Sequence, residues 1–138
     1  MTDQGNRTPL DAASALARNK ATVLAFIEEA VNQGDLDAAR MHFGDTYTQH
    51  SPHIRDGAEG FRRYVEQLRR DFPHVRGEVK RIVAEGDYVF VHLHARREPN
   101  ETGLAIVDIF RLEDGKLAEH WEVRQPIATS ELHGNSMI

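Results

Sequence analysis

The sequence predicts an α+β domain in which three helices precede four antiparallel strands. Apolar residues recur at helical spacing as far as Pro73, and beyond it they alternate with polar residues as strands do. Two short turn signals, Glu85-Gly86-Asp87 and Asp114-Gly115, each separate two alternating segments. Helices followed by consecutive strands are typical of an α+β domain whose helices pack on one face of a curved sheet.

Each predicted helix has its own start and stop signals. The first (8–34) begins with Thr-Pro and ends at a glycine, because a hydroxyl caps free amides and proline loses no bond in the first turn. The second (35–44) runs from an aspartate cap to a glycine, and the third (58–73) is closed by a proline. Between them, the segment DTYTQHSPHIRDG is expected to be a loop.

Composition narrows the function classes. The 138 residues include no Cys, which excludes disulfides, thiolate zinc sites, iron–sulfur clusters and a thiol nucleophile. The formal charge of -5 gives no general attraction for nucleic acid or anionic membranes, so neither partner is expected. No signal-peptide pattern opens the chain, and we expect a cytoplasmic protein with a flexible tail over 1–10 and a single domain over 11–138.

Asp108 is the most informative residue, because it lies within the apolar strand AIVDIFR. Burying a carboxylate without a partner costs several kcal/mol. One interpretation is structural, with a hydrogen bond or ion pair that only fixes the sheet. The other is a general acid/base, since apolar walls favour the protonated form of a carboxyl group and make it useful near neutral pH.

Strand register predicts the neighbours of this carboxylate. If Asp114 and Gly115 are the central turn residues, Asp108 lies opposite Trp121. A symmetric turn about Asn100 would place His92 across from Asp108 as well. The residues then expected on one face with Asp108 are Phe90, His92, His94, Ile106, Phe110 and Trp121.

The remaining histidines allow two interpretations each. By alternation His120 points to the opposite face from Asp108, as a packed or interface side chain. His50 and His53 lie in the expected loop and would usually be solvated, although His50 or Tyr47 could instead close a pocket mouth. Several of these histidines together with Asp108 have the ligand types of a zinc or non-haem iron site, but no motif spacing supports one, so no metal is expected.

Several segments resemble a known family: YTQHSPH, VAEGDYVFVH, VDIFRLEDGKLAEHWEVRQ and the terminal GNSM. The chain resembles, over roughly residues 16–138, the SnoaL-like polyketide cyclases and the bacterial proteins grouped with them as predicted aldol-condensation enzymes, in the nuclear transport factor 2-like superfamily. The resemblance implies a cone-shaped fold whose helices and curved sheet enclose a deep pocket, and subunits that pair through their sheets.

The resemblance also implies a chemistry. In the cyclases the aspartate of the DIFR segment is the acid/base of an aldol ring closure without metal or cofactor, and Asp108 holds that position. A histidine assists, and His92 or His94 falls in the corresponding strand. The short connection EPNETG replaces a longer histidine-containing loop, which implies a different or smaller ligand than a polycyclic polyketide.

The resulting hypothesis is an enzyme of the lyase or isomerase type that needs no cofactor and acts on a small hydrophobic or carbonyl-containing molecule. Asp108 would be the base, with His92, His50 or Tyr47 donating hydrogen bonds to the enolate oxygen. The alternatives are a binding module without catalysis and a hydratase or epoxide hydrolase in which the carboxylate activates water. Apolar residues on both strand faces predict a homodimer. The expected substrate-binding residues are Tyr47, His53, Phe90, His94, Ile106, Phe110, His120 and Trp121.

Overall fold

The computed structural model describes residues 8–138. Its helices are α1 (Pro9–Ile27), which continues directly into the π-helical turn η1 (Glu28–Gln33), α2 (Leu36–Arg40) and α3 (Gly57–Asp71). The predicted caps are present: Thr8 and Asp11 form a capping box at the start of α1. Gly34 ends η1 in the left-handed conformation, with φ of 70°. Local sequence signals therefore set the limits of α1 and η1, whereas α2 ends at Arg40, before the predicted stop at Gly44.

The strands are β1 (Phe43–Gln49), β2 (Arg76–Glu85), β3 (Tyr88–Arg96), β4 (Leu104–Glu113) and β5 (Lys116–Pro126). They form one sheet in the order β1-β5-β4-β3-β2, in which β2 to β5 are antiparallel neighbours and β1 pairs with β5 in parallel. The α+β class is confirmed, but the expected loop and the end of the second helix contain an extra strand. Phe43 and Tyr47 explain it, because their rings pack against each other 4.6 Å apart in the core.

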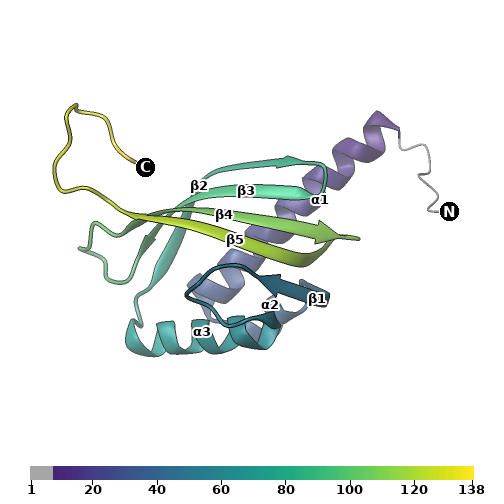
Figure 1. Cartoon of the computed structure of the whole chain (residues 1–138), viewed down its shortest axis with the longest axis horizontal. Helices are drawn as coiled ribbons and strands as arrows, with labels where there is room; N and C mark the ends of the chain where they lie inside the picture. The colour runs from purple at the N-terminus through teal and green to yellow at the C-terminus, as the bar shows by residue number, and fades with distance from the viewer. Residues whose placement is uncertain (1–7) are drawn as a thin grey trace.

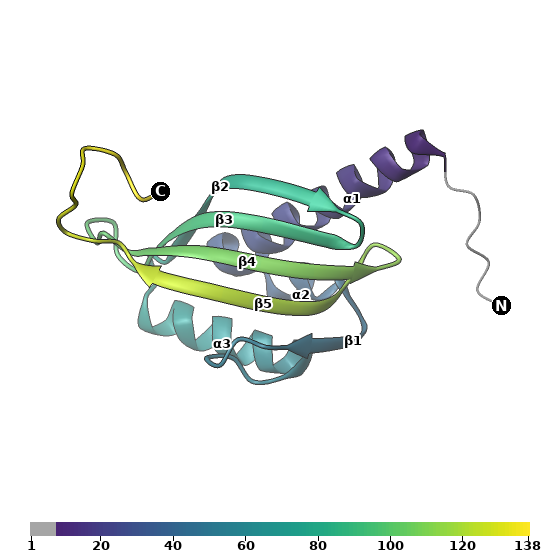
Figure 2. The same cartoon turned by 45° about the horizontal axis from the view of Figure 1, so that its top comes forward.

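The helices lie against one face of the curved sheet (Figures 1 and 2). In Figure 2 the sheet is in front, α1 and α2 lie behind it, and α3 runs beside β1. The core fills the space between sheet and helices, with Val23 and Val65 from the helices and Val89 and Val91 from β3 fully buried. After β5 the chain leaves the sheet in an irregular C-terminal segment, as expected.

The β4–β5 hairpin corrects one predicted register. Its Asp-Gly turn has positive φ at both residues, and Glu113 pairs with Lys116 as predicted. The pairing then shifts between Arg111 and Leu112, where β5 carries one extra residue, Ala118. Leu117 and Ala118 are both buried, so the bulge places two consecutive side chains in the interior. Beyond it Asp108 pairs with Glu122, and the predicted pairing with Trp121 is wrong.

The β3–β4 pairing corrects the second register. Val91, and not His92, lies across from Asp108. The connecting loop is asymmetric: Gly103 has φ of 82°, and the Glu101 carboxylate accepts a hydrogen bond from the backbone amide of Arg97. A slip of one residue exchanges the two faces of a strand, so His92 and His94 lie on the opposite face from Asp108.

The predicted N-terminal tail, 1–10, lies largely outside the described residues. Within them, Pro9 and Leu10 belong to α1. No helix in the described part of the chain combines the length and the apolar character needed to cross a membrane.

Candidate active site

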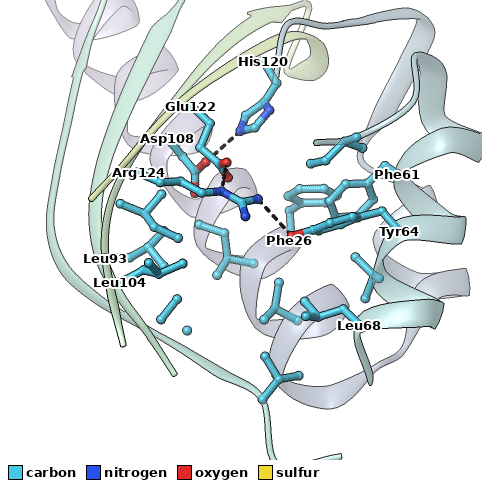
Figure 3. Close-up of a pocket in the computed structure, with 18 of the residues that line it drawn as sticks. Phe26, Phe61, Tyr64, Leu68, Leu93, Leu104, Asp108, His120, Glu122 and Arg124 are labelled. Carbon is cyan, nitrogen blue, oxygen red and sulfur yellow. Dashed lines mark hydrogen bonds and ion pairs between the residues drawn. The ribbon is translucent and has the colours of Figure 1, made fainter. Parts of the chain in front are cut away.

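A cavity of about 190 Å³ lies between the inner face of the sheet and the helices α1 and α3 (Figure 3). A cavity of roughly 150 Å³ is enough to hold a benzene ring, so this one suits a monocyclic or similarly small molecule. Its walls are mostly apolar, and Figure 3 shows Asp108, His120, Glu122 and Arg124 close together on one side of it. Further charged residues, Arg96, Arg97 and Glu101, line the cavity where β3 ends and the loop to β4 begins. The apolar walls include Phe26, Phe61, Val65, Leu68, Leu93, Leu104, Ile106 and Phe110.

Asp108 and His120 form a hydrogen-bonded pair that lines the cavity. Oδ1 of Asp108 lies 2.8 Å from Nε2 of His120, and the two residues are only 8% and 4% exposed. The bulge at Ala118 makes this contact possible, because it turns His120 toward the face that Asp108 occupies. The buried carboxylate therefore has a partner that can also exchange a proton.

A strand that the sequence did not predict reaches the other side of the imidazole. Gln49, at the end of β1, is the parallel-register neighbour of His120 on β5. Its Oε1 lies 2.7 Å from Nδ1 of His120, and its Nε2 donates to the phenol oxygen of Tyr47 at 3.3 Å. Both imidazole nitrogens are thus engaged by side chains.

An ion pair between Arg124 and Glu122 lies next to the Asp108–His120 pair. Nε of Arg124 donates to Glu122, its neighbour on the inner face of β5, and Nη2 of Arg124 donates to the Tyr64 hydroxyl at 2.9 Å. Figure 3 shows the guanidinium group extending from the sheet toward α3. Ser51 also donates to Glu122, at 3.4 Å. Arg124 therefore connects the sheet to the helix that covers it.

Burial and charge shift the protonation of these groups. Burial, and secondly the negative charge of Asp108, raise the pKa of the Tyr47 phenol far above its usual value, so that it stays a neutral donor. The same two causes raise the pKa of Glu122, against the opposing hydrogen bond from Arg124. Burial is the largest single influence on Arg124 and works against its charge, but the hydrogen bond and negative charge of Glu122, together with the Tyr64 contact, outweigh it and raise the pKa of Arg124.

Asp108, His120 and Glu122 could also bring one ligand atom each to a metal ion, since such atoms lie within 4.8 Å of one another. Each already has a partner: His120 holds Asp108, and the Arg124 cation holds Glu122. A fixed guanidinium beside a ligand repels a further cation, so these contacts suit proton transfer better than metal binding.

The sequence matches the family profile described as the SnoaL-like domain over residues 23–120. The chain belongs to the SnoaL-like domain family. No curated protein matches the sequence.

Solved structures agree on the fold. The chain has a TM-score of 0.68 and 18% identity with a Bacillus cereus protein provisionally assigned as a polyketide cyclase, and the match covers 78% of this chain and 74% of that one. TsrD from Streptomyces laurentii has a TM-score of 0.66 and 22% identity with the chain, and the match covers 78% of this chain and 87% of TsrD. An NTF2-like protein of unknown function from Cytophaga hutchinsonii has a TM-score of 0.64 and 22% identity with the chain, and the match covers 78% of this chain and 90% of that one. The SnoaL-like domain thus has the nuclear transport factor 2-like fold.

Within this SnoaL-like domain, part of the predicted site converges on the cavity. Its lining includes Tyr47, Ile106, Asp108, Phe110 and His120. His120 was expected on the other face, and the bulge in β5 is the reason that it is not.

The other predicted site residues lie away from Asp108. His92 contacts Arg81, and His94 contacts the carbonyl of Thr102, both on the outer face of the sheet. His50 stacks on the Trp121 ring with centroids 4.8 Å apart, and its Nε2 lies 2.6 Å from Glu119. Phe90 is 43% exposed and His53 is also exposed.

Four polar groups of the site were not predicted: Gln49, Tyr64, Glu122 and Arg124. A signal for two of them existed, since His120, Glu122 and Arg124 alternate along β5 and thus share one face. The register counted from the Asp114-Gly115 turn, without a bulge, placed Trp121 on the face of Asp108 instead.

Proposed function

We propose that this SnoaL-like domain is an enzyme of the lyase or isomerase type that works without a cofactor. Its reaction would be an aldol condensation or a related cyclisation of a small carbonyl compound. The observation that carries the proposal is the buried Asp108–His120 pair, which faces a cavity with mostly apolar walls. Such a carboxylate, held beside a second proton carrier, is suited to general acid/base catalysis.

The first step is proton transfer from carbon. Asp108 accepts a proton from the carbon next to a carbonyl group, and the C–H electron pair moves to give an enolate whose negative charge lies on the carbonyl oxygen. The enolate carbon then attacks a second carbonyl group and forms a carbon–carbon bond. The resulting alkoxide takes the proton back, which returns the pair to its starting state.

Two groups that line the cavity can stabilise the enolate oxygen. Tyr47 accepts a hydrogen bond from Gln49, which leaves its own O–H free to donate. Arg124 uses Nε for Glu122 and Nη2 for Tyr64, and within the described residues its Nη1 has no protein partner. Donors that are fixed before the reaction stabilise developing charge strongly in a site that excludes water. In this proposal Tyr47 and Arg124 donate the hydrogen bonds to the enolate oxygen that the sequence analysis expected from His92 or His50.

Isotope exchange tests the proposal without knowledge of the natural substrate. Small cyclic ketones and 1,3-dicarbonyl compounds are incubated with the protein in deuterated water, and NMR follows loss of the α-proton signal. We expect exchange above the protein-free rate that Asp108→Asn abolishes and His94→Asn retains. Dialysis against a chelator should leave the rate unchanged. Binding of these compounds without any exchange would instead favour the module that binds and does not catalyse.

A hydratase or epoxide-hydrolase activity is the second candidate. A bound water needs two to four polar partners, and Tyr47, Asp108, Glu122 and Arg124 supply them around one end of the cavity. Asp108 would then take its proton from water and not from carbon. Incorporation of ¹⁸O from labelled water into the product of an epoxide or enone distinguishes this reaction from the aldol type.

We also propose that a second copy of the chain covers the outer face of the sheet. Val83 and Val123 are each 63% exposed there, and Tyr88 and Phe90 are more than 40% exposed. Several exposed apolar side chains on one face of a sheet favour an interaction site there. A cytoplasmic location remains a prediction from the sequence.

A further inference from the structure

We infer that Gln49 is a positioning residue that fixes the tautomer of His120, and thereby places one proton between His120 and Asp108. The inference rests on the proposed function and specifies how the acid/base pair is held. It assigns a role to β1, the strand that the sequence did not predict, and to a side chain that need not touch the substrate.

The orientation of the Gln49 amide is set by its backbone neighbour. The amide N–H of Ser51 donates to Oε1 of Gln49 at 3.0 Å. A backbone N–H can only donate, so the amide oxygen and not the NH₂ group must face it. The NH₂ group points the other way and donates to Tyr47. Ser51 is 4% exposed, so water does not readily replace this contact.

The same oxygen then determines which imidazole nitrogen carries hydrogen. Oε1 of Gln49 lies 2.7 Å from Nδ1 of His120. Because the oxygen can only accept, Nδ1 must donate and is therefore protonated. In a neutral imidazole this leaves a lone pair on Nε2, which points at Asp108.

Two acceptors cannot face each other at hydrogen-bond distance. Nε2 of His120 and Oδ1 of Asp108 are 2.8 Å apart, and a bare nitrogen against an ionised oxygen would be repulsive. A single proton must lie between them, either on the carboxyl group or on the imidazole. The pair therefore holds a proton that it can donate, while the second oxygen of Asp108 remains able to accept one.

The backbone keeps Gln49 in place. Gln49 and His120 are register neighbours on the parallel strands β1 and β5, and the amide of His50 donates to the His120 carbonyl at 2.9 Å. The backbone N–H of Gln49 donates to the carboxylate of Asp56, and this carboxylate also caps the start of α3. The glutamine is thus held by the sheet on one side and by a helix start on the other.

NMR of the histidine side-chain nitrogens tests the inference on the protein without substrate. Long-range ¹H–¹⁵N spectra distinguish a protonated ring nitrogen from a bare one. The chain has eight histidines, and the signals of His120 are those that disappear in His120→Asn. We expect Nδ1 to be protonated in the unmodified protein, Gln49→Leu to lose this preference, and Gln49→Glu, which keeps an acceptor oxygen, to retain it.

The control is Gln67→Leu, which removes an exposed glutamine of α3 and should leave the His120 signals unchanged. A bare Nδ1 in the unmodified protein overturns the inference, as do His120 signals that stay the same in a folded Gln49→Leu variant. If Gln49→Leu does not fold, the spectrum of the unmodified protein decides by itself. Since no turnover is measured, this result is independent of whether the isotope-exchange experiment succeeds.

Discussion

The two faces of the sheet carry similar residue types in different surroundings. On the inner face, His120 is 4% exposed and contacts a carboxylate and an amide beside a cavity. On the outer face, His50 is exposed and lies between Trp121 and Glu119. Both histidines have an acidic partner at hydrogen-bond distance, but the inner pair is buried and faces a cavity with mostly apolar walls.

The difference shows that the surroundings of an acid–histidine contact decide how strong the contact is and whether a bound molecule can reach it. Water screens the outer pair and competes for its hydrogen bonds, so such a contact contributes little. Exclusion of water strengthens electrostatic interactions around the inner pair and gives a bound molecule direct access to it. The following predictions compare the two faces, beginning with the largest effect.

The largest expected effect is on catalysis. Asp108→Asn should lower turnover by about 10²- to 10⁴-fold, the usual contribution of a placed general base. His92→Asn, on the outer face, should leave turnover unchanged. The comparison is made by kcat/KM on a substrate identified through isotope exchange, with circular dichroism to show that both variants fold. Equal activity of the two variants would contradict the assignment of the site to the inner face.

The ion pairs of the two faces should differ in stability. Arg124→Met leaves the Glu122 side chain, 8% exposed, without its cation, and removing one partner of a buried pair costs about 3–5 kcal/mol. Arg111→Met breaks the pairs with Glu113 and Glu119 at the surface, where a pair contributes about 0–1 kcal/mol. Urea unfolding measures both. Adding Glu122→Gln to Arg124→Met should restore part of the loss, and a failure to do so would show that packing of the arginine dominates.

Association through the outer face should respond to charge. The chain should sediment as a dimer at micromolar concentration, and the double variant Phe90→Lys/Val123→Lys should sediment as a monomer, because it places charges on exposed apolar positions. Leu132→Lys, at a fully exposed position of the C-terminal segment, is the matched control and should remain dimeric. A monomeric unmodified chain would count against pairing through the sheet.

The smallest effect is a pH dependence of opposite sign at two glutamates of β5. Hydrogen bonds from Arg111 and His50 lower the pKa of Glu119, so its contribution to stability is present above pH 4.5 and is lost as the pH falls through the lowered value. Burial raises the pKa of Glu122, so its contribution is present below pH 4.5 and is lost as the pH rises through the raised value.

Free energies of unfolding measured against pH check these signs. The free energy of unfolding of Glu119→Gln should be lower than that of the unmodified chain above pH 4.5, and the two should converge in acid. Glu122→Gln should instead improve relative to the unmodified chain as the pH rises. Curves that move in the same direction for both variants would refute the contrast between the faces.

Most of the fold could be predicted from the sequence because its signals are local. The Thr-Pro start of α1, the left-handed Gly34 and the Asp-Gly turn depend on a few adjacent residues each. The strand β1 (FGDTYTQ) escaped prediction because Gly44 was taken as a helix stop and the Asp, Ser, Pro and Gly residues after it indicated a loop, although Phe, Thr and Tyr favour strands. It is a strand because β5 supplies its backbone partners and the core accepts its aromatic rings.

The site was only partly predictable. Asp108 stands out from the sequence alone, because a carboxylate in an apolar strand needs a partner. Its partner depends on Ala118, an extra residue that no local pattern marks, and the bulge exchanges Trp121 for His120 on the inner face. Gln49 joins the site through a parallel pairing of strands that lie far apart in the sequence.

The sequence by itself determined the three helices, the four antiparallel strands β2 to β5, the turns between these strands and the position of Asp108, an acid that needs a partner in the interior. Only the tertiary structure decided that the partner of Asp108 is His120, that Gln49 contacts the other side of His120, and that Arg124 pairs with Glu122 beside them. The physical reason is that side chains alternate across a strand, so a shift of one residue in pairing reverses the inside and the outside without changing any local preference.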